Sequence, residues 1–221
     1  MDLDELTERA RRLCSGPGRR VLGITGPPGV GKTTLVEALL ARLRTPPAPG
    51  QGAGGTAYGR GDWVAHVPMD GFHLADVQLE RLGLRDRKGA PETFDAGGYL
   101  SLLQRFVSDE PRVLYAPGFE RELEQPLAAA IAIPPSTRLL LTEGNYLLLP
   151  EGDWPAVREL LDAVWYVELG ERERVRRLVD RHVAFGKSPR EAASWVERTD
   201  EANSRLVAAT RARADLVVNE W

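Results

Sequence analysis

The chain has 221 residues, of which 43% are hydrophobic and 28% are charged, and these values are ordinary for one folded domain. Its net charge of -3 excludes a strong general attraction to nucleic acid or to an acidic membrane, so neither is an expected partner. A single cysteine, Cys14, excludes an intrachain disulfide, and no apolar run reaches the length of a membrane span. With a first segment too charged for a signal peptide, these features favour a cytoplasmic protein.

Hydrophobic periodicity predicts helices that alternate with short apolar strands. In chain order, the first half is predicted to contain helix 3–13, strand 21–24, helix 33–43, strand 63–68, helix 75–83 and helix 96–107. The second half is predicted to contain a short strand at 112–115, strand 138–142, helix 154–162, strand 163–167, helix 171–184, a long helix from 189 to about 210 and strand 216–218. This alternation indicates an α/β fold whose parallel sheet is covered on both faces.

One segment interrupts this alternation. Residues 45–61 are so rich in proline and glycine that they predict a flexible surface loop rather than a packed element. The same alternation of strands and helices resumes after it, so we do not expect a domain boundary there. Residues 1–221 are therefore predicted to form a single domain.

A complete phosphate-binding motif, Gly26-x-x-x-x-Gly31-Lys32-Thr33, lies between an apolar strand and an amphipathic helix. Its glycines let the backbone point N–H groups at phosphate oxygens, and the helix start adds partial positive charge. Lys32 is expected to reach the β- and γ-phosphates, and the Thr33 hydroxyl is expected to bind Mg²⁺. The predicted nucleotide-binding residues are Gly26, Gly29, Val30, Gly31, Lys32, Thr33 and Thr34.

Two other predicted strands end in an acid followed by a glycine, Asp70-Gly71 and Glu143-Gly144. Because ligands bind at the carboxyl ends of parallel strands, both acids are expected to face the triphosphate. Asp70 is predicted to orient an acceptor hydroxyl and receive its proton, or to help hold Mg²⁺. Glu143 is predicted to hold the Mg²⁺ shell. The alternatives are a helix cap for Asp70 and an ordinary strand-end carboxylate for Glu143.

Aromatic and cationic residues near these strand ends are candidates for an acceptor pocket. Phe72 and His73 directly follow Asp70-Gly71 and are expected to form one wall. Arg87 and Lys88 are adjacent cations beside a Gly-Ala-Pro turn, where they could bind an anionic group. The other candidates are Tyr115, Phe119 and Arg121. A solvated loop or ordinary packing is the alternative for these residues.

The order of four segments, GPPGVGKTT, VPMDGFHL, RKGAPETFD and LTEGNYLLL, resembles the P-loop small-molecule kinases, which include uridine kinase, pantothenate kinase and phosphoribulokinase. RKGAPETFD is similar to a pantothenate kinase segment, whereas EGNYLLL and YAPGFERELEQP look like a nucleoside or sugar kinase-like branch. The resemblance covers roughly residues 20–218. YAPGFERELEQP matches neither uridine kinase nor pantothenate kinase closely, so the resemblance does not identify the acceptor.

The resemblance implies a P-loop NTPase fold, with three α/β/α layers, a mostly parallel central sheet and a helical lid. It also implies ATP and Mg²⁺ as cofactors, with catalytic roles for Asp70, Lys32 and Glu143 and metal binding by Thr33, Glu143 and Asp70. The segment at about 171–187 resembles the lid, and its arginines would neutralise phosphate charge. The lid candidates that share a helix face are Arg174, Arg177 and Arg181. A surface helix with ordinary charge alternation is the alternative.

The sequence thus predicts an ATP- and Mg²⁺-dependent kinase that transfers the γ-phosphate to a hydroxyl of a small nucleoside, pantothenate-like or sugar acceptor. A regulatory GTPase would need an Asn-Lys-x-Asp motif, which the chain lacks. An ATPase or binding module that couples nucleotide hydrolysis to a protein partner stays open as the alternative. So does a homodimer.

The P-loop motif generates the first prediction. Lys32→Ala should reduce phosphoryl transfer to background while leaving the fold intact, because it removes the cation that reaches the β- and γ-phosphates. ADP release measures the transfer, and circular dichroism with thermal melting measures the fold. A folded variant with near-normal turnover would contradict the prediction that the chain is a P-loop kinase.

Overall fold

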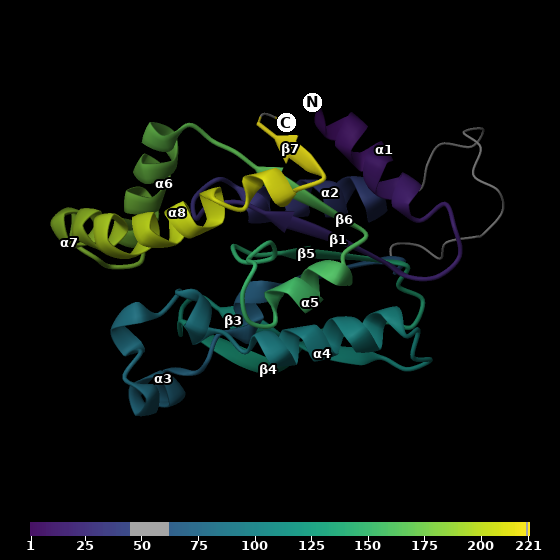
Figure 1. Cartoon of the computed structure of the whole chain (residues 1–221), viewed down its shortest axis with the longest axis horizontal. Coiled ribbons are helices and arrows are strands. Elements are labelled where there is room, and N and C mark those ends of the chain that lie inside the picture. The colour runs from purple at the N-terminus through teal and green to yellow at the C-terminus, as the bar shows by residue number, and fades with distance from the viewer. Residues whose placement is uncertain (45–61, 220) are drawn as a thin grey trace.

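The computed structural model describes residues 1–44, 62–219 and 221, so the predicted loop 45–61 lies outside the described residues. Its centre is a sheet of five parallel strands in the order β2-β5-β1-β6-β7 (Figure 1). The strands are β1 (Arg20–Thr25), β2 (Val64–Pro68), β5 (Leu139–Glu143), β6 (Ala163–Val167) and β7 (Leu216–Val218). Each lies where a strand was predicted, which confirms the parallel sheet.

Helices cover both faces of this sheet and produce three α/β/α layers (Figure 1). On one face lie α1 (Leu3–Leu13) and α2 (Lys32–Arg44), and on the other lie α4 (Ala96–Val107) and α5 (Trp154–Glu159). Val21 and Leu22 are both fully buried, in two different apolar clusters, because successive strand side chains point to opposite faces. Among the described residues, no helix combines the length and apolar content that a bilayer crossing requires.

A second sheet, the antiparallel hairpin of β3 (Leu114–Glu120) and β4 (Gln125–Ile133), was largely missed by the sequence prediction. Only a short strand at 112–115 was expected, because β4 contains a proline and several alanines, which have low strand propensity. Pro117 cannot donate to the ladder. The pairing shifts around it, from Ala116–Ile131 to Gly118–Leu127, which leaves residues 128–130 opposite Pro117 alone.

The segment between β2 and α4 turns back on itself. It contains α3 (Asp76–Leu82) and two short 3-10 turns, Arg85–Arg87 and Pro91–Thr93. Its ends are joined by backbone hydrogen bonds, from Leu74 N–H to the Thr93 carbonyl at 2.9 Å and from Asp95 N–H to the Phe72 carbonyl at 2.7 Å. The polar residues of 85–95 are therefore held near the carboxyl end of β2.

The C-terminal helices project from one end of the sheet (Figure 1). They are α6 (Glu171–Ala184), α7 (Pro189–Trp195) and α8 (Glu201–Ala208). A capping box begins α7, since the Ser188 hydroxyl accepts from Glu191 N–H and the Glu191 carboxylate accepts from Ser188 N–H. The long helix predicted from 189 to about 210 is confirmed over 189–208, although a π-helical turn, Val196–Asp200, lies inside it and divides it into α7 and α8.

Gly71 and Gly144 have a packing role that the sequence did not reveal. A β-carbon on Gly71 would lie 2.3 Å from the Pro117 carbonyl oxygen of β3. A β-carbon on Gly144 would lie 2.5 Å from the Met69 β-carbon. Neither glycine has positive φ, so neither is needed for a sharp turn. Instead, the two glycines let the hairpin and the end of β2 approach closely.

Gly71→Ala should therefore lower the free energy of unfolding by roughly 1–3 kcal/mol, because the hairpin must move away from the end of β2. Gly16→Ala is the matched control, since its β-carbon would meet only a flexible Arg20 side chain at 3.6 Å. We expect the control to stay within about 0.5 kcal/mol of the parent chain. Urea unfolding measures both, and equal stability of the two variants would contradict this view of the hairpin.

Candidate active site

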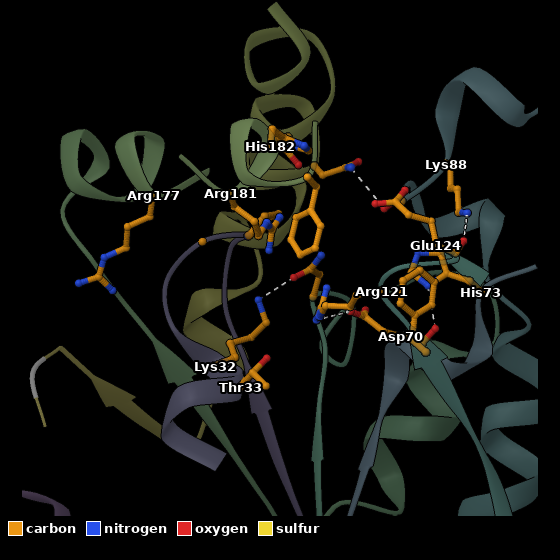
Figure 2. A pocket seen from close by; sticks show the side chains of 18 of the residues that line it. Lys32, Thr33, Asp70, His73, Lys88, Arg121, Glu124, Arg177, Arg181 and His182 are labelled. Atoms are coloured by element: carbon orange, nitrogen blue, oxygen red, sulfur yellow. Dashed lines mark hydrogen bonds and ion pairs between the residues drawn. The ribbon is translucent and has the colours of Figure 1, made fainter. Parts of the chain in front are cut away.

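A cavity of about 800 Å³ opens where β1, β2 and β5 end. Its floor includes Gly29, Gly31 and Thr34 of the P-loop, and Asp70 and Glu143 line it from neighbouring strand ends. Helices α6–α8 form the opposite wall (Figure 2). This volume lies within the usual range of small-molecule sites. The structure therefore brings the phosphate motif and both predicted acids to one cavity.

The P-loop backbone has the conformation that its glycines predict. Gly26 has a φ of 142°, and a β-carbon there would lie 2.4 Å from the Val167 carbonyl oxygen. Gly29 has a φ of 85°, and a β-carbon there would lie 2.8 Å from the Leu178 side chain of α6. A larger residue at either position would move β6 or α6 away from the loop. The motif thus fixes the contact between the loop and the first lid helix.

Lys32 is held inside the loop by three acceptors. Its ammonium donates to the carbonyls of Gly26 at 2.9 Å and Pro27 at 3.1 Å, and to Asn145 Oδ1 at 2.7 Å. Burial lowers the pKa of Lys32 to about 8, while the carboxylates of Glu143 and Asp70 oppose this shift. An incoming phosphate would strengthen the charged form of the lysine by the same electrostatic effect.

Glu143 is a buried carboxylate that contacts the P-loop threonine. Thr33 Oγ1 donates to Glu143 Oε1 at 3.1 Å. Burial and then the Asp70 carboxylate raise the pKa of Glu143, while Lys32 and the Thr33 hydrogen bond lower it. The nearby Asp70 carboxylate disfavours the charged form of Glu143, and a cation bound beside Glu143 would remove that cost.

Thr33, Glu143 and Asp70 supply the oxygen atoms that Mg²⁺ prefers. Within the described residues, no group of three or more His, Cys, Asp and Glu side chains could hold a metal ion alone. Mg²⁺ is usually bound by one or two carboxylates together with substrate phosphates, so this donor set fits the ion. Thr33 and Glu143 are the first candidates, because they already touch.

Asp70 lies in a 3-10 turn, Met69–Phe72, directly after β2. Its carboxylate faces the cavity and lies 3.7 Å from Arg121 Nη2 of the hairpin turn (Figure 2). The alternative that Asp70 caps the next helix is wrong, because the N-cap of α3 is Ala75. Its side chain is thus available to a ligand in the cavity.

The acceptor side of the cavity contains four of the predicted pocket residues. The His73 ring lies between Phe94, 4.0 Å away between centroids, and Phe119, 5.0 Å away. Lys88 donates to Asp76 Oδ1 at 2.7 Å and to the Glu124 carbonyl, which ties its loop to the hairpin. The predicted residues that line the cavity on this side are His73, Lys88, Phe119 and Arg121.

Three predicted pocket residues lie elsewhere. Phe72 packs in the core against Tyr99, with ring centroids 5.0 Å apart. Tyr115 is 60% exposed on the hairpin, outside the cavity. Arg87 forms an ion pair with Glu92 at 2.5 Å on the surface. For Phe72 and Arg87, the next residue in the chain, His73 or Lys88, lines the cavity instead, a distinction that the sequence did not contain.

The three lid arginines do not line the cavity together. Arg174 is buried and is bonded to Glu201 at 2.6 Å and Ser204 at 2.8 Å, so it joins α6 to α8 and does not line the cavity. Arg177 and Arg181 do line it. Arg177 is bonded to Glu173 at 2.9 Å and points away from Asp70 (Figure 2). Arg181 has no ion pair among the residues that the structure describes.

Several cavity residues were missed by the sequence analysis. Asn145 lies two residues after Glu143, and this position in the strand-end motif was the only available signal. His182 and Asp200 approach to 2.9 Å across the lid, and Asp200 ends the π-helical turn, a feature common at functional sites. The other missed lining residues include Glu37, Arg85, Glu124, Phe185, Lys187 and Trp195.

Comparisons with known proteins agree with this geometry, although no family model matches the chain. A protein of Schizosaccharomyces pombe named "Putative uridine kinase C227.14" is 32% identical, over 98% of this chain and 90% of that protein. The "Uncharacterized protein YggC" of Escherichia coli is 29% identical, over 90% of this chain and 77% of that protein.

Solved structures agree as well. A "putative fructose transport system kinase" from Silicibacter sp. TM1040 has a TM-score of 0.83 and 32% identity, with 98% of both chains covered. YFH7 of Saccharomyces cerevisiae, described as "a putative P-loop containing kinase", has a TM-score of 0.81 over 100% of this chain and 99% of that chain. At 18% identity, the second likeness supports the fold alone.

Arg174, which is buried, and Arg181, which lines the cavity, should respond differently to substitution. Arg174→Met should lower the free energy of unfolding by about 2–3 kcal/mol, because it leaves Glu201 largely buried without its partner. Arg181→Met should leave stability unchanged and lower phosphoryl transfer roughly 10²-fold, because it removes a cation that faces the phosphates. Urea unfolding and ADP release measure the two effects. If both variants are stable and lose the same activity, this result would indicate that Arg174 also acts at the phosphate site.

Proposed function

The chain belongs to the uridine kinase-like family of P-loop kinases, and on that premise we propose that it transfers the γ-phosphate of ATP to a hydroxyl of a small metabolite. One observation carries the proposal: Lys32, after β1, and Asp70, after β2, line the same cavity from the two sides of β5 (Figure 2). The first is a phosphate-binding cation, and the second is a carboxylate positioned to accept a proton.

The P-loop would bind the triphosphate. Its N–H groups and Lys32 would contact the β- and γ-phosphates, where negative charge moves during transfer. Thr33 and Glu143 would hold Mg²⁺ together with phosphate oxygens. When bound, this ion supplies charge neutralisation and aligns the γ-phosphate for transfer.

Asp70 would act on the acceptor. Its carboxylate takes the proton of the acceptor hydroxyl while that oxygen forms a bond to the γ-phosphorus. The bond from the γ-phosphorus to the bridging oxygen breaks, and ADP leaves with the electron pair. Arg121, 3.7 Å from Asp70, keeps the carboxylate in the cavity and adds a cation near the transferred group.

Helices α6–α8 would form the lid over this reaction, with residues 171–187 as its first part. Arg181 is placed to neutralise phosphate charge, and closure would exclude water that competes with the acceptor. The proposed compartment is the cytoplasm, in keeping with a single, buried cysteine, Cys14.

The alternative is a P-loop ATPase or binding module that couples hydrolysis to a protein partner. The shape of the cavity favours the kinase, because it extends beyond Asp70 to His73, Lys88 and Phe119. A hydrolase needs to position only a water molecule, and it has no use for a further pocket with aromatic walls. The two functions differ in the product that they release.

An acceptor panel separates the two functions. The chain is incubated with ATP and Mg²⁺ in the presence of uridine, fructose or pantothenate, and ADP release is measured together with the mass of the acceptor. A mass increase of one phosphoryl group supports the kinase. ADP release that no acceptor stimulates, with inorganic phosphate as the product, supports the ATPase.

Asp70→Asn should lower kcat roughly 10²-fold or more and leave ATP affinity unchanged, because it keeps the shape of the side chain and removes the proton acceptor. Arg87→Met is the control, since Arg87 lies outside the cavity. Steady-state ADP release and ATP titration by calorimetry measure the two properties. If kcat is normal and only the melting temperature falls, Asp70 has a structural role.

A further inference from the structure

The backbone around Asn145 is fixed against the end of β1. Asn145 lies two residues after β5, which lies between β1 and β2 in the sheet. Thr25 Oγ1 donates to the Asn145 carbonyl at 3.1 Å, and Gly144 N–H donates to the Ile24 carbonyl at 3.1 Å. The next residue, Tyr146, is fully buried. Asn145 is therefore held on both sides at a point where it lines the cavity.

The side-chain amide of Asn145 has one possible orientation. Its Oδ1 lies 2.7 Å from the ammonium nitrogen of Lys32, which also donates to the carbonyls of Gly26 and Pro27. An ammonium group has only donors, so the amide oxygen must face Lys32. The amide nitrogen, Nδ2, with its two N–H donors, is then the atom that faces away from the lysine.

Nδ2 of Asn145 has donors but no acceptor. Among the residues that the structure describes, no hydrogen bond is made by Nδ2, and it is not one of the fully buried polar atoms that lack a partner. Because Asn145 lines the cavity, this accessible atom is open to a ligand there. An N–H group pairs with an oxygen that carries negative charge and has nothing to offer a cation. The free donors therefore suit an anion.

The position of Asn145 matches the path of the transferred phosphate. Figure 2 shows Lys32 on one side of the cavity and Asp70 on the other, and their strands, β1 and β2, flank β5. In the proposed reaction the γ-phosphate is bound by Lys32 and forms a bond to the oxygen that Asp70 deprotonates. This group must pass the end of β5. Since Oδ1 and Nδ2 belong to one amide, a phosphate oxygen bound to Lys32 would lie next to Nδ2.

We propose that Asn145 is a further catalytic residue, whose Nδ2 donates a hydrogen bond to an oxygen of the γ-phosphate as charge shifts during transfer. This inference rests on the proposed function and adds a neutral donor to it. The contact with Asn145 is the shortest of the three that Lys32 makes, so a phosphate oxygen displaces a loop carbonyl first and the amide keeps its orientation. ADP, which has no γ-phosphate, does not meet Nδ2.

Binding measurements test this contact without any acceptor. Asn145→Leu should weaken the binding of a non-hydrolysable ATP analogue about tenfold and change the affinity for ADP by less than about twofold. Calorimetry with Mg²⁺ measures both ligands, and Asn219→Leu, at an exposed position outside the cavity, is the matched control. If Asn145 only held Lys32, both affinities would fall together, because Lys32 reaches the β-phosphate as well. An equal loss, or no loss, would overturn the proposal.

Asn145→Asp separates the two atoms of the amide. It keeps an oxygen for Lys32 and removes both N–H donors, so the affinity for the ATP analogue should fall at least as far as in Asn145→Leu. A residue that only holds Lys32 would retain more affinity as aspartate than as leucine, and that result would overturn the proposal. Both variants should melt within a few degrees of the parent chain.

Spectra of the parent chain give a measurement that no substitution can disturb. The chain has three asparagines, Asn145, Asn203 and Asn219, so selective ¹⁵N-asparagine labelling gives three side-chain amide groups, which Asn145→Asp serves to assign. The ATP analogue should shift the Asn145 amide signals much further than ADP does, while those of Asn219 stay in place. Equal shifts with the two nucleotides would contradict a contact with the γ-phosphate.

Turnover tests the catalytic part of the proposal. With an acceptor that the panel identifies, Asn145→Leu should lower kcat roughly 10²-fold and leave the acceptor KM within about twofold. A normal kcat would overturn the catalytic role of Asn145 and leave the kinase intact. Absence of transfer to every acceptor by the parent chain would overturn the proposed function. The binding measurements and the spectra would still decide whether Asn145 contacts the γ-phosphate, because they need no acceptor.

Discussion

The burial of Lys32 and Glu143 at the ends of two neighbouring strands is the constraint around which the site is built. Removing either charge from water costs several kcal/mol unless nearby groups compensate. The structure compensates Lys32 with two loop carbonyls and Asn145, and Glu143 with the Thr33 hydroxyl. This arrangement is weak evidence for stability, because apolar residues could fill the same space at lower cost. In the proposed function its value is clear, since a triphosphate and a cation would both find partners of opposite charge already in place.

Two glycines bring the acceptor side against this charged centre. Without a β-carbon at Gly144, Met69 can pack beside the end of β5, and without one at Gly71, Pro117 of the hairpin can approach β2. The hairpin then carries Phe119 and Arg121 to Asp70 and His73. Acid-glycine pairs at strand ends thus have a steric reason in addition to the proposed catalytic one.

The sequence predicted the sheet and the phosphate loop well, because both depend on local patterns. Apolar runs of five or six residues locate the strands, and the spacing of the motif locates Lys32. The β3–β4 hairpin was missed because Pro117 and the alanines of β4 hide its strand propensity.

The sequence also did not predict the direction in which individual side chains point. In the short turns after β2 and α3, Phe72 and Arg87 point away from the cavity while their neighbours His73 and Lys88 point into it. Helical periodicity placed Arg174 with Arg181, but contacts with α8, which lies distant in sequence, turned Arg174 into a link between helices. Such long-range contacts leave no local pattern that a single sequence could reveal.

The lid and the acceptor loop are one connected structure. The Gly89 carbonyl accepts from Tyr146 at 2.5 Å and from Asn203 of α8 at 3.3 Å, while the adjacent Lys88 is bonded to the hairpin. Movement of α8 would therefore displace the loop next to His73. In the proposed reaction the P-loop determines only how the triphosphate is held, whereas the acceptor would contact segments 73, 85–94 and 119–124. A fold shared with relatives named for uridine and for fructose is consistent with this division, since the acceptor side can change while the phosphate side is kept.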